Sequence, residues 1–596
     1  MTHRNPRRAF LPIWLQLLLG VLRHRPDRAI AVAYWYLTRR FVRARNRLHE
    51  AAAELLPAYK TWISLVEYAE FEEFLAGEPA TDRVGRPRFS LVLHAPAWTS
   101  DAALDRTLAS IYHQTCPDWN VIVTGQLQQG AVAAPQITHL PLAGPDRASA
   151  LRPALATASG DFVIIVPPDA MLPAWALARY QQAAEEAPGA AIFYGDEDVI
   201  DDAGRRVQPW FKPLWNSELI LAQDYMSNAC AITTPLARAV GAIPQELAGC
   251  AGYALLLAAT MRPGADVRHV AHVLCHLPDA PGRDDQGARL RAVARHVEAE
   301  HGSAEAGPFG TIRVRWPLPD PAPTVTIIVP TRDRVELLEA CIGSLLRETR
   351  YPHYDVVVVD NQSVEPRTHA WFEAISAETR VSVLRYDHSY NYSAINNFAA
   401  ARARGAYLCM LNNDTEIIDG AWLGELMRYA TRPGVGAVGA KLLYDDRSIQ
   451  HAGVVMGLGN AAGHAHRALP DDEQGYFALA HCAHHASAVT AACLVVERAK
   501  FEAVGGFDET HLQIAYNDVD LCLKLERAGW RNIYAPQAVL IHHESKSRGL
   551  DTSPQHVKRY MRELAVLQER WATTEIVDPM HHPRLDRSSE TYRIRL

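Results

Sequence analysis

The sequence predicts an α/β fold with two mostly parallel β-sheets, one in each half of a 596-residue chain. Strand-like apolar runs alternate with helical patterns from residue 87 to about 300, which is typical of parallel sheets, and the alternation restarts after residue 324. The two halves also resemble each other: GDFVIIVPPDAMLPAWAL in the first parallels GAYLCMLNNDTEIIDGAWL in the second. We therefore expect two tandem Rossmann-like domains.

The elements divide the chain into five segments. Residues 1–86 have a helical pattern. Residues 87–301 contain the first set of strands, and residues 302–323 are rich in Pro and Gly, as linkers are. Residues 324–550 contain the second set, including a helix at 334–348 whose apolar residues recur at helical spacing. Residues 551–596 begin with a further helical pattern and end irregularly.

Composition excludes several classes of function. The chain is 48% apolar and 21% charged, as globular proteins are, and its net charge of -7 gives no support to a nucleic-acid partner. The nine cysteines are scattered without any CxxC pair, which argues against zinc or redox motifs and predicts free thiols in a reducing, cytoplasmic compartment.

The N-terminus leaves two interpretations open. The apolar run at residues 10–22 is shorter than the roughly twenty residues that span a bilayer. Residues 28–48 mix aromatic residues with arginines, as interfacial amphipathic helices do. This region is either a pair of helices packed on the first domain or a peripheral attachment to the inner face of the cytoplasmic membrane.

Polar motifs follow the strands of the second half. Between residues 323 and 549 the chain reads, in order, VTIIVPTRDR, VVVVDNQS, YNYSAINNFA, LCMLNNDTEI, GGFDE, YNDVDLCLKL and LIHHESKSRG. Ligands of open α/β sheets bind beyond the carboxyl ends of strands, where these polar residues stand. This order resembles the inverting nucleotide-sugar glycosyltransferases of family two, which have the GT-A fold. Tandem bacterial enzymes of polysaccharide or O-antigen assembly resemble it too, and rhamnosyl transfer is one candidate.

The resemblance implies a donor site for a nucleoside-diphosphate sugar, with UDP- and dTDP-sugars favoured. Residues after the first two strands would bind the nucleotide, and a polar helix start would hold the diphosphate; these donor-binding candidates are Thr331, Asp333, Asp360, Asn361, Asn396, Asn413 and Asp414. Some of these residues also have a purely structural interpretation. Asp333 could be a helix N-cap and Asp360 a plain turn residue. The helix start that contains Asn396 could serve only in capping and packing.

The resemblance also implies a divalent cation, Mn²⁺ or Mg²⁺. The turn LNNDTE stands where the family carries its DxD motif, but only Asp414 is a carboxylate, so metal affinity would be weaker or would depend on another ligand. By resemblance that ligand is His542, with His543 as the second choice. Both histidines could instead be surface residues.

The general base implied by the resemblance is Asp518. It lies at a helix start, and we expect the helix dipole to keep its carboxylate anionic; Asn517 is the expected N-cap. Asp508 of GGFDE and Asp520 are auxiliary candidates on the acceptor side, and Arg548 would close over phosphate together with Lys546. The structural alternative is that Asp518 and Asp520 only place negative charge in the first turn of the helix, where the helix dipole stabilises it.

The first half lacks these groups. It keeps Asp169 in VPPDA, but Gly252 stands where the late acid should be, and glycine cannot act as a base. We expect this domain to be structural or to hold an acceptor. The histidine-rich segment 451–485 could be a zinc site, but its Gly-rich character and the absence of a Cys pair favour an acceptor loop or surface histidines.

The sequence therefore predicts a glycosyltransferase whose second domain is catalytic and whose acceptor is a glycan, with a lipid-linked glycan left open. A non-catalytic sugar- or nucleotide-binding scaffold of a glycan assembly complex is the alternative. A sugar nucleotidyltransferase is disfavoured because VPTRDRVE carries no glycine for a phosphate loop.

Overall fold

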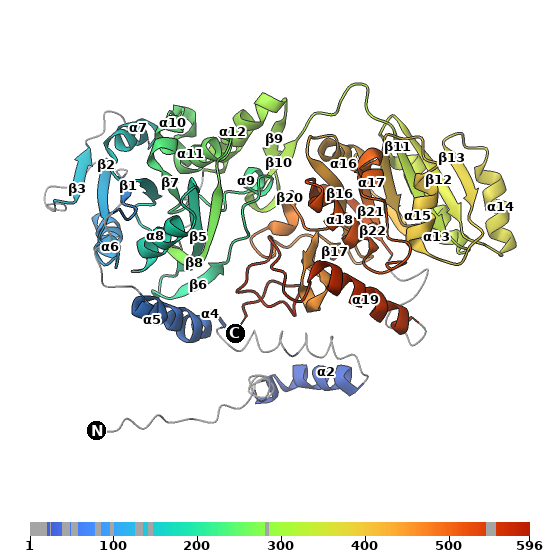
Figure 1. Ribbon diagram of the computed structural model, residues 1–596, viewed down its shortest axis with the longest axis horizontal. Coiled ribbons are helices and arrows are strands. Elements are labelled where there is room, and N and C mark those ends of the chain that lie inside the picture. The colour runs from blue at the N-terminus through green and yellow to red at the C-terminus, as the bar shows by residue number, and fades with distance from the viewer. Residues whose placement is uncertain are drawn as a thin grey trace. The chain divides into compact units, whose positions relative to one another are not determined.

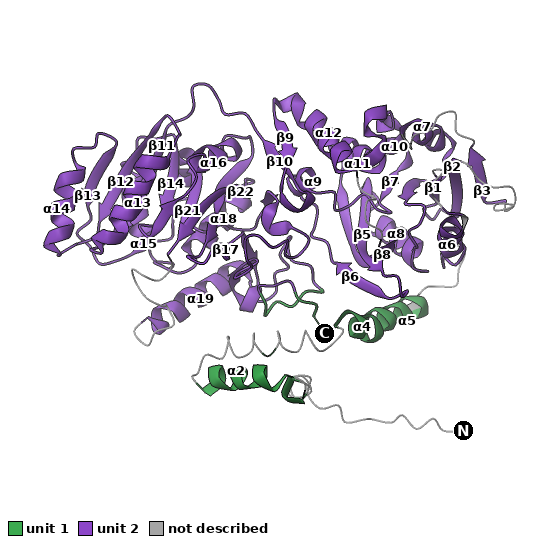
Figure 2. Ribbon diagram, turned by 180° about the vertical axis from the view of Figure 1, so that it is seen from behind, with its two compact units in different colours: residues 1–82, 584–589, 593–596 green, residues 83–583, 590–592 purple. Residues whose placement is uncertain are grey.

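The structure, a computed structural model, describes residues 19, 21–23, 25–37, 48, 58–77, 85–95, 100–125, 135–140, 147–279, 285–543 and 556–595. They divide into two compact units (Figure 2). Unit 1 comprises residues 1–82, 584–589 and 593–596, and unit 2 comprises residues 83–583 and 590–592.

Unit 1 is helical where it is described. Its helices are α2 (Pro26–Leu37), α4 (Ala58–Trp62) and α5 (Tyr68–Gly77), with a π-helical turn η1 (Ile63–Glu67) between the last two. Arg584 binds Glu70 of α5 at 2.6 Å, so the C-terminal segment belongs to this unit. No helix among the described residues is long and apolar enough to cross a bilayer. The apolar run at 10–22 lies mostly outside those residues.

Unit 2 contains two large sheets, which confirms the predicted α/β fold class (Figure 1). In the first sheet the strand order is β3-β2-β1-β4-β7-β5-β6, and β8 pairs with β5. Strands β1 to β4 are parallel, and β7 runs against its neighbours. The strands are β1 (Phe89–Ala95), β2 (Trp119–Gly125), β3 (Ile137–Leu140), β4 (Phe162–Val166), β5 (Ile192–Ile200), β6 (Arg206–Trp210), β7 (Ala231–Thr233) and β8 (Val267–Pro278).

The second sheet repeats this arrangement, in the order β13-β12-β11-β14-β21-β16-β22-β15. Its first four strands are parallel, β21 is antiparallel, and β16 and β22 are again parallel to each other. The strands are β11 (Val325–Thr331), β12 (Tyr354–Asp360), β13 (Val381–Arg385), β14 (Tyr407–Leu411), β15 (Thr415–Ile417), β16 (Val435–Leu443), β21 (Cys493–Glu497) and β22 (Arg531–His542). Every residue of β16 is buried, as expected of a strand covered on both faces.

Helices flank both sheets. Those of the first half are α6 (Asp101–Tyr112), α7 (Arg147–Thr157), α8 (Ala176–Glu186), α9 (Leu219–Ala222), α10 (Thr234–Val240), α11 (Ala251–Thr260) and α12 (Gln286–Val297). Those of the second are α13 (Val335–Glu348), α14 (Pro366–Ile375), α15 (Tyr392–Ala400), α16 (Trp422–Ala430), α17 (Arg498–Ala503), α18 (Asn517–Arg527) and α19 (Val557–Trp571). In α13 the predicted apolar stripe is buried at Leu338, Cys341, Ile342 and Leu345.

Short elements complete unit 2. Residues 302–323 include an antiparallel hairpin of β9 (Ser303–Ala306) and β10 (Ile312–Arg315) between the two sheets (Figure 1). The segment 445–490 holds the short strands β17 (Ile449–His451), β18 (Val454–Met456), β19 (Ala462–His464) and β20 (His484–His485). All nine cysteines are free and buried.

Helix α19 packs on the second half although it lies beyond the expected limit of that domain. Leu567 of α19 belongs to the hydrophobic core built around β14, β16 and α18. Its neighbours Arg570 and Trp571 both bond the Asp520 carboxylate of α18, at 2.8 and 2.9 Å. The C-terminal helix therefore supports the helix that carries Asp518.

Candidate active site

A cavity of about 790 Å³ lies at the carboxyl ends of β11 and β14 in the second half. Five of the predicted site residues line it: Thr331, Asn413, Asp414, Asp518 and His542. Thr331 ends β11, and its hydroxyl accepts a hydrogen bond from the side-chain amide of Asn413 at 3.1 Å. The turn after β14 is thereby fixed to the end of the neighbouring strand.

Strand pairing brings Asp414 and His542 together. The turn 412–414 leads from β14 into β15, and β15 pairs with β22 so that Thr415 lies opposite His542. Asp414, the residue before Thr415, then has Oδ1 at 3.1 Å from Nε2 of His542. Residues more than a hundred positions apart in sequence thus meet because of one antiparallel register.

The His542 ring is oriented by Gln450. Its Nδ1 lies 2.6 Å from Oε1 of Gln450, an atom that can only accept a hydrogen bond, so Nδ1 carries a proton. The Nε2 atom lies 3.1 Å from Oδ1 of Asp414 and 3.2 Å from the side-chain amide of Asn412, from which an unprotonated Nε2 can accept a hydrogen bond. Nε2 is also the ring atom left to bind a cation beside the Asp414 carboxylate. A metal-ligating histidine commonly donates its other N–H to an oxygen in this way.

The pair fits a hard divalent cation. Adjacent ligands of an octahedral ion with bonds of about 2.1 Å lie about 3 Å apart, close to the observed separation. Burial alone would raise the pKa of Asp414, but its hydrogen bond and charge interaction with His542 hold that pKa below the usual value. The carboxyl is therefore ionised, as a metal ligand must be.

Asp518 lies in the first turn of α18. Its Oδ2 accepts from the backbone N–H of Ala491 at 3.1 Å, and its Oδ1 accepts from that of Val519 at 2.9 Å. Burial raises the pKa of this carboxyl, and these hydrogen bonds offset only part of the effect. Loss of water around the carboxyl therefore outweighs any stabilisation of the charge by the helix start, and the expectation that the carboxylate is anionic at neutral pH stays a prediction.

Asn517 does not cap α18, contrary to expectation. The N-cap is Tyr516 in the left-handed conformation, and Asn517 is already the first helical residue, its side chain donating to the Ser393 hydroxyl at 3.1 Å. The loop before the helix is held instead by Glu563 of α19, whose carboxylate accepts from the backbone N–H groups of Ile514 and Ala515 at 3.2 and 2.9 Å.

Several lining residues were not predicted. Arg332 is exposed at the edge of the cavity, directly after Thr331. Arg467 also lines it, with Nε donating to the Tyr444 hydroxyl at 2.8 Å. Tyr560 of α19 lines it too, and its hydroxyl meets that of Tyr516 at 2.6 Å. Arg332 stood within a quoted motif and could have been named, but nothing in the sequence marks Arg467 or Tyr560.

Three predicted nucleotide-binding residues lie outside this cavity. The Asp333 carboxylate accepts from the N–H groups of Val364 and Glu365 at 2.8 and 2.9 Å, so it does not cap the helix that follows it. Asp360 is buried and forms an ion pair with Arg385. The side-chain amide of Asn361 donates to the carbonyl of His388 at 2.7 Å. These contacts order the loops around the ends of β11 and β12.

The other predicted residues do not line the cavity, and one is outside the described residues. Asn396 is fully buried in α15 and donates to the Tyr392 carbonyl at 2.8 Å. His543 is paired with Asp445 and lies 3.4 Å from Glu416. Arg570 binds both auxiliary acids, Asp508 at 2.7 Å and Asp520 at 2.8 Å. Arg548 lies outside the described residues.

The histidine-rich segment gives no zinc site within the described residues. His451 and His464 lie 3.0 Å apart through their Nδ1 atoms, and burial lowers the pKa of His451 well below the usual value. Among the described residues, the only cluster of three potential metal ligands is formed by Asp196 and His269 of the first half and His582 of the C-terminal segment. Of the segment's histidines, His464 lines the cavity.

Part of this site lies in a segment that is similar to a known protein family. Residues 326–481 match the family described as Glycosyl transferase family 2, a span that holds β11 and the 412–414 turn but ends before Asp518 and His542. The chain is 40% identical over 447 residues to the uncharacterized protein y4gI of Sinorhizobium fredii, covering 72% of this chain and 49% of that protein. It is 34% identical over 568 residues to the O-antigen biosynthesis protein RfbC of Myxococcus xanthus, covering 91% of this chain and 43% of RfbC.

A shorter match concerns the N-acetylglucosaminyl-diphospho-decaprenol L-rhamnosyltransferase of Mycobacterium tuberculosis, 43% identical over 63 residues, which are 11% of this chain and 20% of that enzyme. The chain thus spans half or less of the length of the two long relatives.

Proposed function

We propose that this protein is an inverting glycosyltransferase whose second half transfers a sugar from a nucleoside-diphosphate donor to a glycan. One observation carries the proposal: the partly buried Asp518 carboxylate and the Asp414–His542 pair line the same cavity. A proton acceptor and a divalent-cation site in one cavity are what this transfer needs. The match to Glycosyl transferase family 2 over residues 326–481 supports it independently.

The chemistry assigns one role to each group. Asp518 accepts the proton of the acceptor hydroxyl as that oxygen attacks the anomeric carbon. The diphosphate leaves on the opposite face with the bonding electron pair, so the anomeric configuration inverts. Asp414 and His542 would hold Mn²⁺ or Mg²⁺, which supplies charge neutralisation to the departing diphosphate. Arg332, exposed at the rim, is placed to add a further positive charge.

The acceptor is proposed to be a growing polysaccharide, as the O-antigen biosynthesis protein RfbC suggests by its name. A lipid-linked glycan and a rhamnosyl donor are the more specific candidates, which the short match to the decaprenol-linked rhamnosyltransferase favours. UDP- and dTDP-sugars are the donors to test first. A location at the inner face of the cytoplasmic membrane accords with such an acceptor.

The test is release of nucleoside diphosphate from UDP-, dTDP- and GDP-sugars with Mn²⁺ or Mg²⁺, with and without EDTA. We expect at least one donor to be consumed, faster when a glycan acceptor is added, and the product to have the inverted anomeric configuration by NMR. Saturable donor binding without turnover on any acceptor would contradict the proposal and favour a non-catalytic scaffold.

A further inference from the structure

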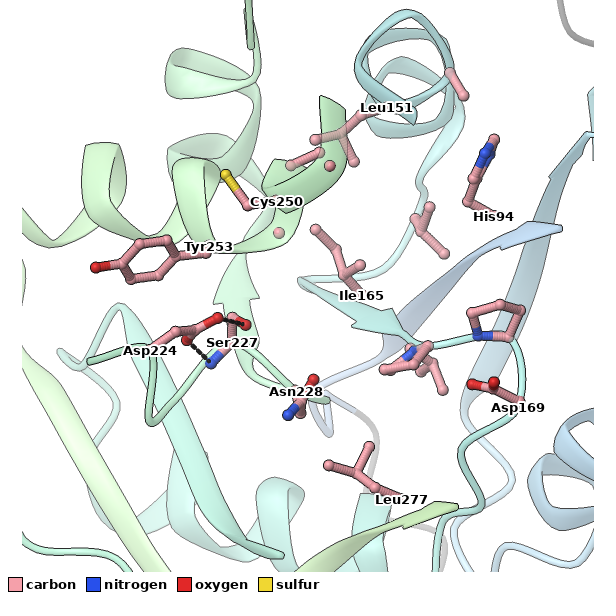
Figure 3. A pocket seen from close by; sticks show the side chains of 18 of the residues that line it. His94, Leu151, Ile165, Asp169, Asp224, Ser227, Asn228, Cys250, Tyr253 and Leu277 are labelled. Carbon is pink, nitrogen blue, oxygen red and sulfur yellow. Dashed lines mark hydrogen bonds between the residues drawn. The ribbon is translucent and has the colours of Figure 1, made fainter. Parts of the chain in front are cut away.

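A second cavity, of about 330 Å³, lies in the first half at the carboxyl ends of β1, β2 and β4 (Figure 3). It shares no lining residue with the cavity around Asp518. Its position on its own sheet matches that of the first cavity on the other sheet, because the order β3-β2-β1-β4-β7-β5 in one corresponds to β13-β12-β11-β14-β21-β16 in the other. The structure therefore allows the two cavities to be compared residue by residue.

The base and the metal-binding histidine have no counterpart in this second cavity. Gly252 is the second residue of α11, as Asp518 is of α18, and both line their cavities. The bridge between Met171 and His276 corresponds to the pairing of Glu416 with Ile541. The residue after Ile541 is His542 and the residue after His276 is Leu277. Leu277 therefore occupies the position of His542. Leu277 lines the cavity with an apolar side chain (Figure 3). Of the base and the two proposed metal ligands of the second half, this cavity keeps only the counterpart of Asp414, which is Asp169.

The nucleotide side has changed as well. The pairing of β1 with β2 matches that of β11 with β12, which puts Gly125 at the position of Asp360. A Cβ atom at Gly125 would lie 2.0 Å from the carbonyl oxygen of Ala95, and the residue has a φ of +116°. No side chain fits at this position, so the first half cannot have a carboxylate equivalent to that of Asp360.

Hydroxyl-binding groups remain in the second cavity. The Asp224 carboxylate accepts from the Ser227 hydroxyl at 2.5 Å, and the two side chains point toward each other in Figure 3. The side-chain amide of Asn228 lies 3.2 Å from Oε2 of Glu197. Trp210 lines the same cavity, is 7% exposed, and its indole N–H has no hydrogen-bond partner among the described residues. Carboxylate and amide groups and an indole N–H can form hydrogen bonds with sugar hydroxyls.

The charge of the cavity disfavours a diphosphate. Three carboxylates line it, those of Asp169, Glu197 and Asp224, whereas the described residues of its lining include no lysine or arginine. The nearby ammonium group of Lys212 is fully buried and bound to Glu197 at 2.9 Å. The volume lies at the lower end of the range of small-molecule sites, which begins at about 300 Å³. A small neutral ligand therefore fits both the charge and the size.

We propose that this cavity is a non-catalytic binding site for a neutral saccharide, and, resting on the glycosyltransferase function proposed above, that the saccharide is part of the acceptor glycan. Trp210 connects the site to the other half, since its ring stacks on Phe477 with centroids 4.4 Å apart. Phe477 belongs to segment 445–490, the same segment that contributes His464 and Arg467 to the catalytic cavity. A glycan held in the first half would thus lie against the segment that borders the catalytic cavity.

The test is saturation-transfer NMR on the full chain with methyl glycosides of glucose, galactose, mannose and rhamnose, and with UDP. Gly252→Leu should fill the cavity without disturbing the backbone, because a Cβ at Gly252 meets only Ile165, at 3.9 Å. Asn228→Ala is the second variant. We expect both to weaken binding of at least one glycoside about tenfold or more. UDP binding and donor hydrolysis should be unchanged.

Two results would overturn the inference: no glycoside bound by the wild type, or glycoside binding unchanged in both variants. UDP binding that is lost in Gly252→Leu would also contradict it, since the cavity would then be a nucleotide site. Failure of the proposed catalytic function is distinguishable. In that case no donor is hydrolysed, whereas glycoside binding still depends on Gly252 and Asn228.

Discussion

Two carboxylates in the first turn of α18, those of Asp518 and Asp520, have different environments. Asp518 lines the cavity that we propose to be catalytic, and burial raises its pKa. Asp520 is fully buried and bonded to Arg570 and Trp571. A general base works best when its pKa approaches the working pH, so the raised pKa suits Asp518 to catalysis, while Asp520 serves to hold helices together.

The pH dependence of activity follows from Asp518. Its carboxylate must be ionised to accept a proton, so kcat/KM should fall as the pH drops through its pKa, at a pH above the ordinary aspartate range. The effect of Asp518 on the free energy of unfolding has the opposite pH dependence. Because its pKa is raised in the folded state, its favourable contribution to stability exists at low pH and is lost as the pH rises through the folded-state pKa. A pH profile of kcat/KM, with thermal melts at each pH, checks both. An acidic limb at or below pH 4 would contradict the assignment.

Gln450 offers a test of the cation site that leaves its ligands in place. Gln450→Leu removes the acceptor that orients the His542 ring, at 2.6 Å, without touching Asp414. We expect the Mn²⁺ concentration for half-maximal activity to rise about 10–100-fold, with kcat at saturating metal largely restored. Metal binding followed by calorimetry provides a second readout. An unchanged metal requirement would mean that His542 is not a ligand.

At the residue scale the sequence located part of the site. Asp414 and Asp518 could be predicted because each stands in a recognisable motif after a strand or at a helix start. Gln450, Arg467 and Tyr560 could not, because they come from an irregular segment and from the tail, and only the fold brings them to the cavity. Asp333 follows β11 and Asp360 ends β12, and both bond neighbouring protein groups; that they bind the nucleotide stays a prediction.

At the element scale, α18 is held by α19. Arg570 joins α19 to Asp508 and Asp520 at 2.7 and 2.8 Å. Arg570→Met leaves the buried Asp520 with fewer partners and should destabilise the protein by about 1.5–3 kcal/mol in urea unfolding. Arg562→Met, an exposed change on the same helix, should cost about 0.5 kcal/mol or less.

The Arg570 contact also has a pH signature. Burial alone would raise the pKa of Asp508, but hydrogen bonds from His511 and Arg570 lower it to about 2. The stabilisation is therefore present above the unfolded-state pKa, about 3.9, and is lost as the pH falls toward 2. Arg570→Met should reduce this acid sensitivity. Equal acid sensitivity in the two proteins would contradict the role given to Arg570.

The strands and helices themselves were predictable because their apolar periodicity is local. The parallel cores of both sheets and the buried stripe of α13 follow from such patterns. The pairing of β15 with β22, which brings His542 to Asp414, depends on a contact between distant segments and has no local signal. The same holds for the packing of α19 on the second half.

On the scale of the whole molecule, two sheets with the same strand order differ in their chemistry. The second half has Asp518, His542 and Asp360 where the first has Gly252, Leu277 and Gly125. Asp169 is the acid that the first half keeps at the position of Asp414. The account therefore assigns bond formation to the second half and saccharide binding to the first.

The most direct test of this division is donor turnover by Asp518→Asn and Asp169→Asn, measured as nucleoside diphosphate release beside the wild type. We expect Asp518→Asn to lower kcat/KM about 10²–10⁴-fold, with a melting temperature no lower than that of the wild type. Asp169→Asn should retain wild-type donor turnover. If Asp169→Asn abolished turnover, or if Asp518→Asn left it intact, the second half would not be the sole catalytic one and the central claim would be wrong.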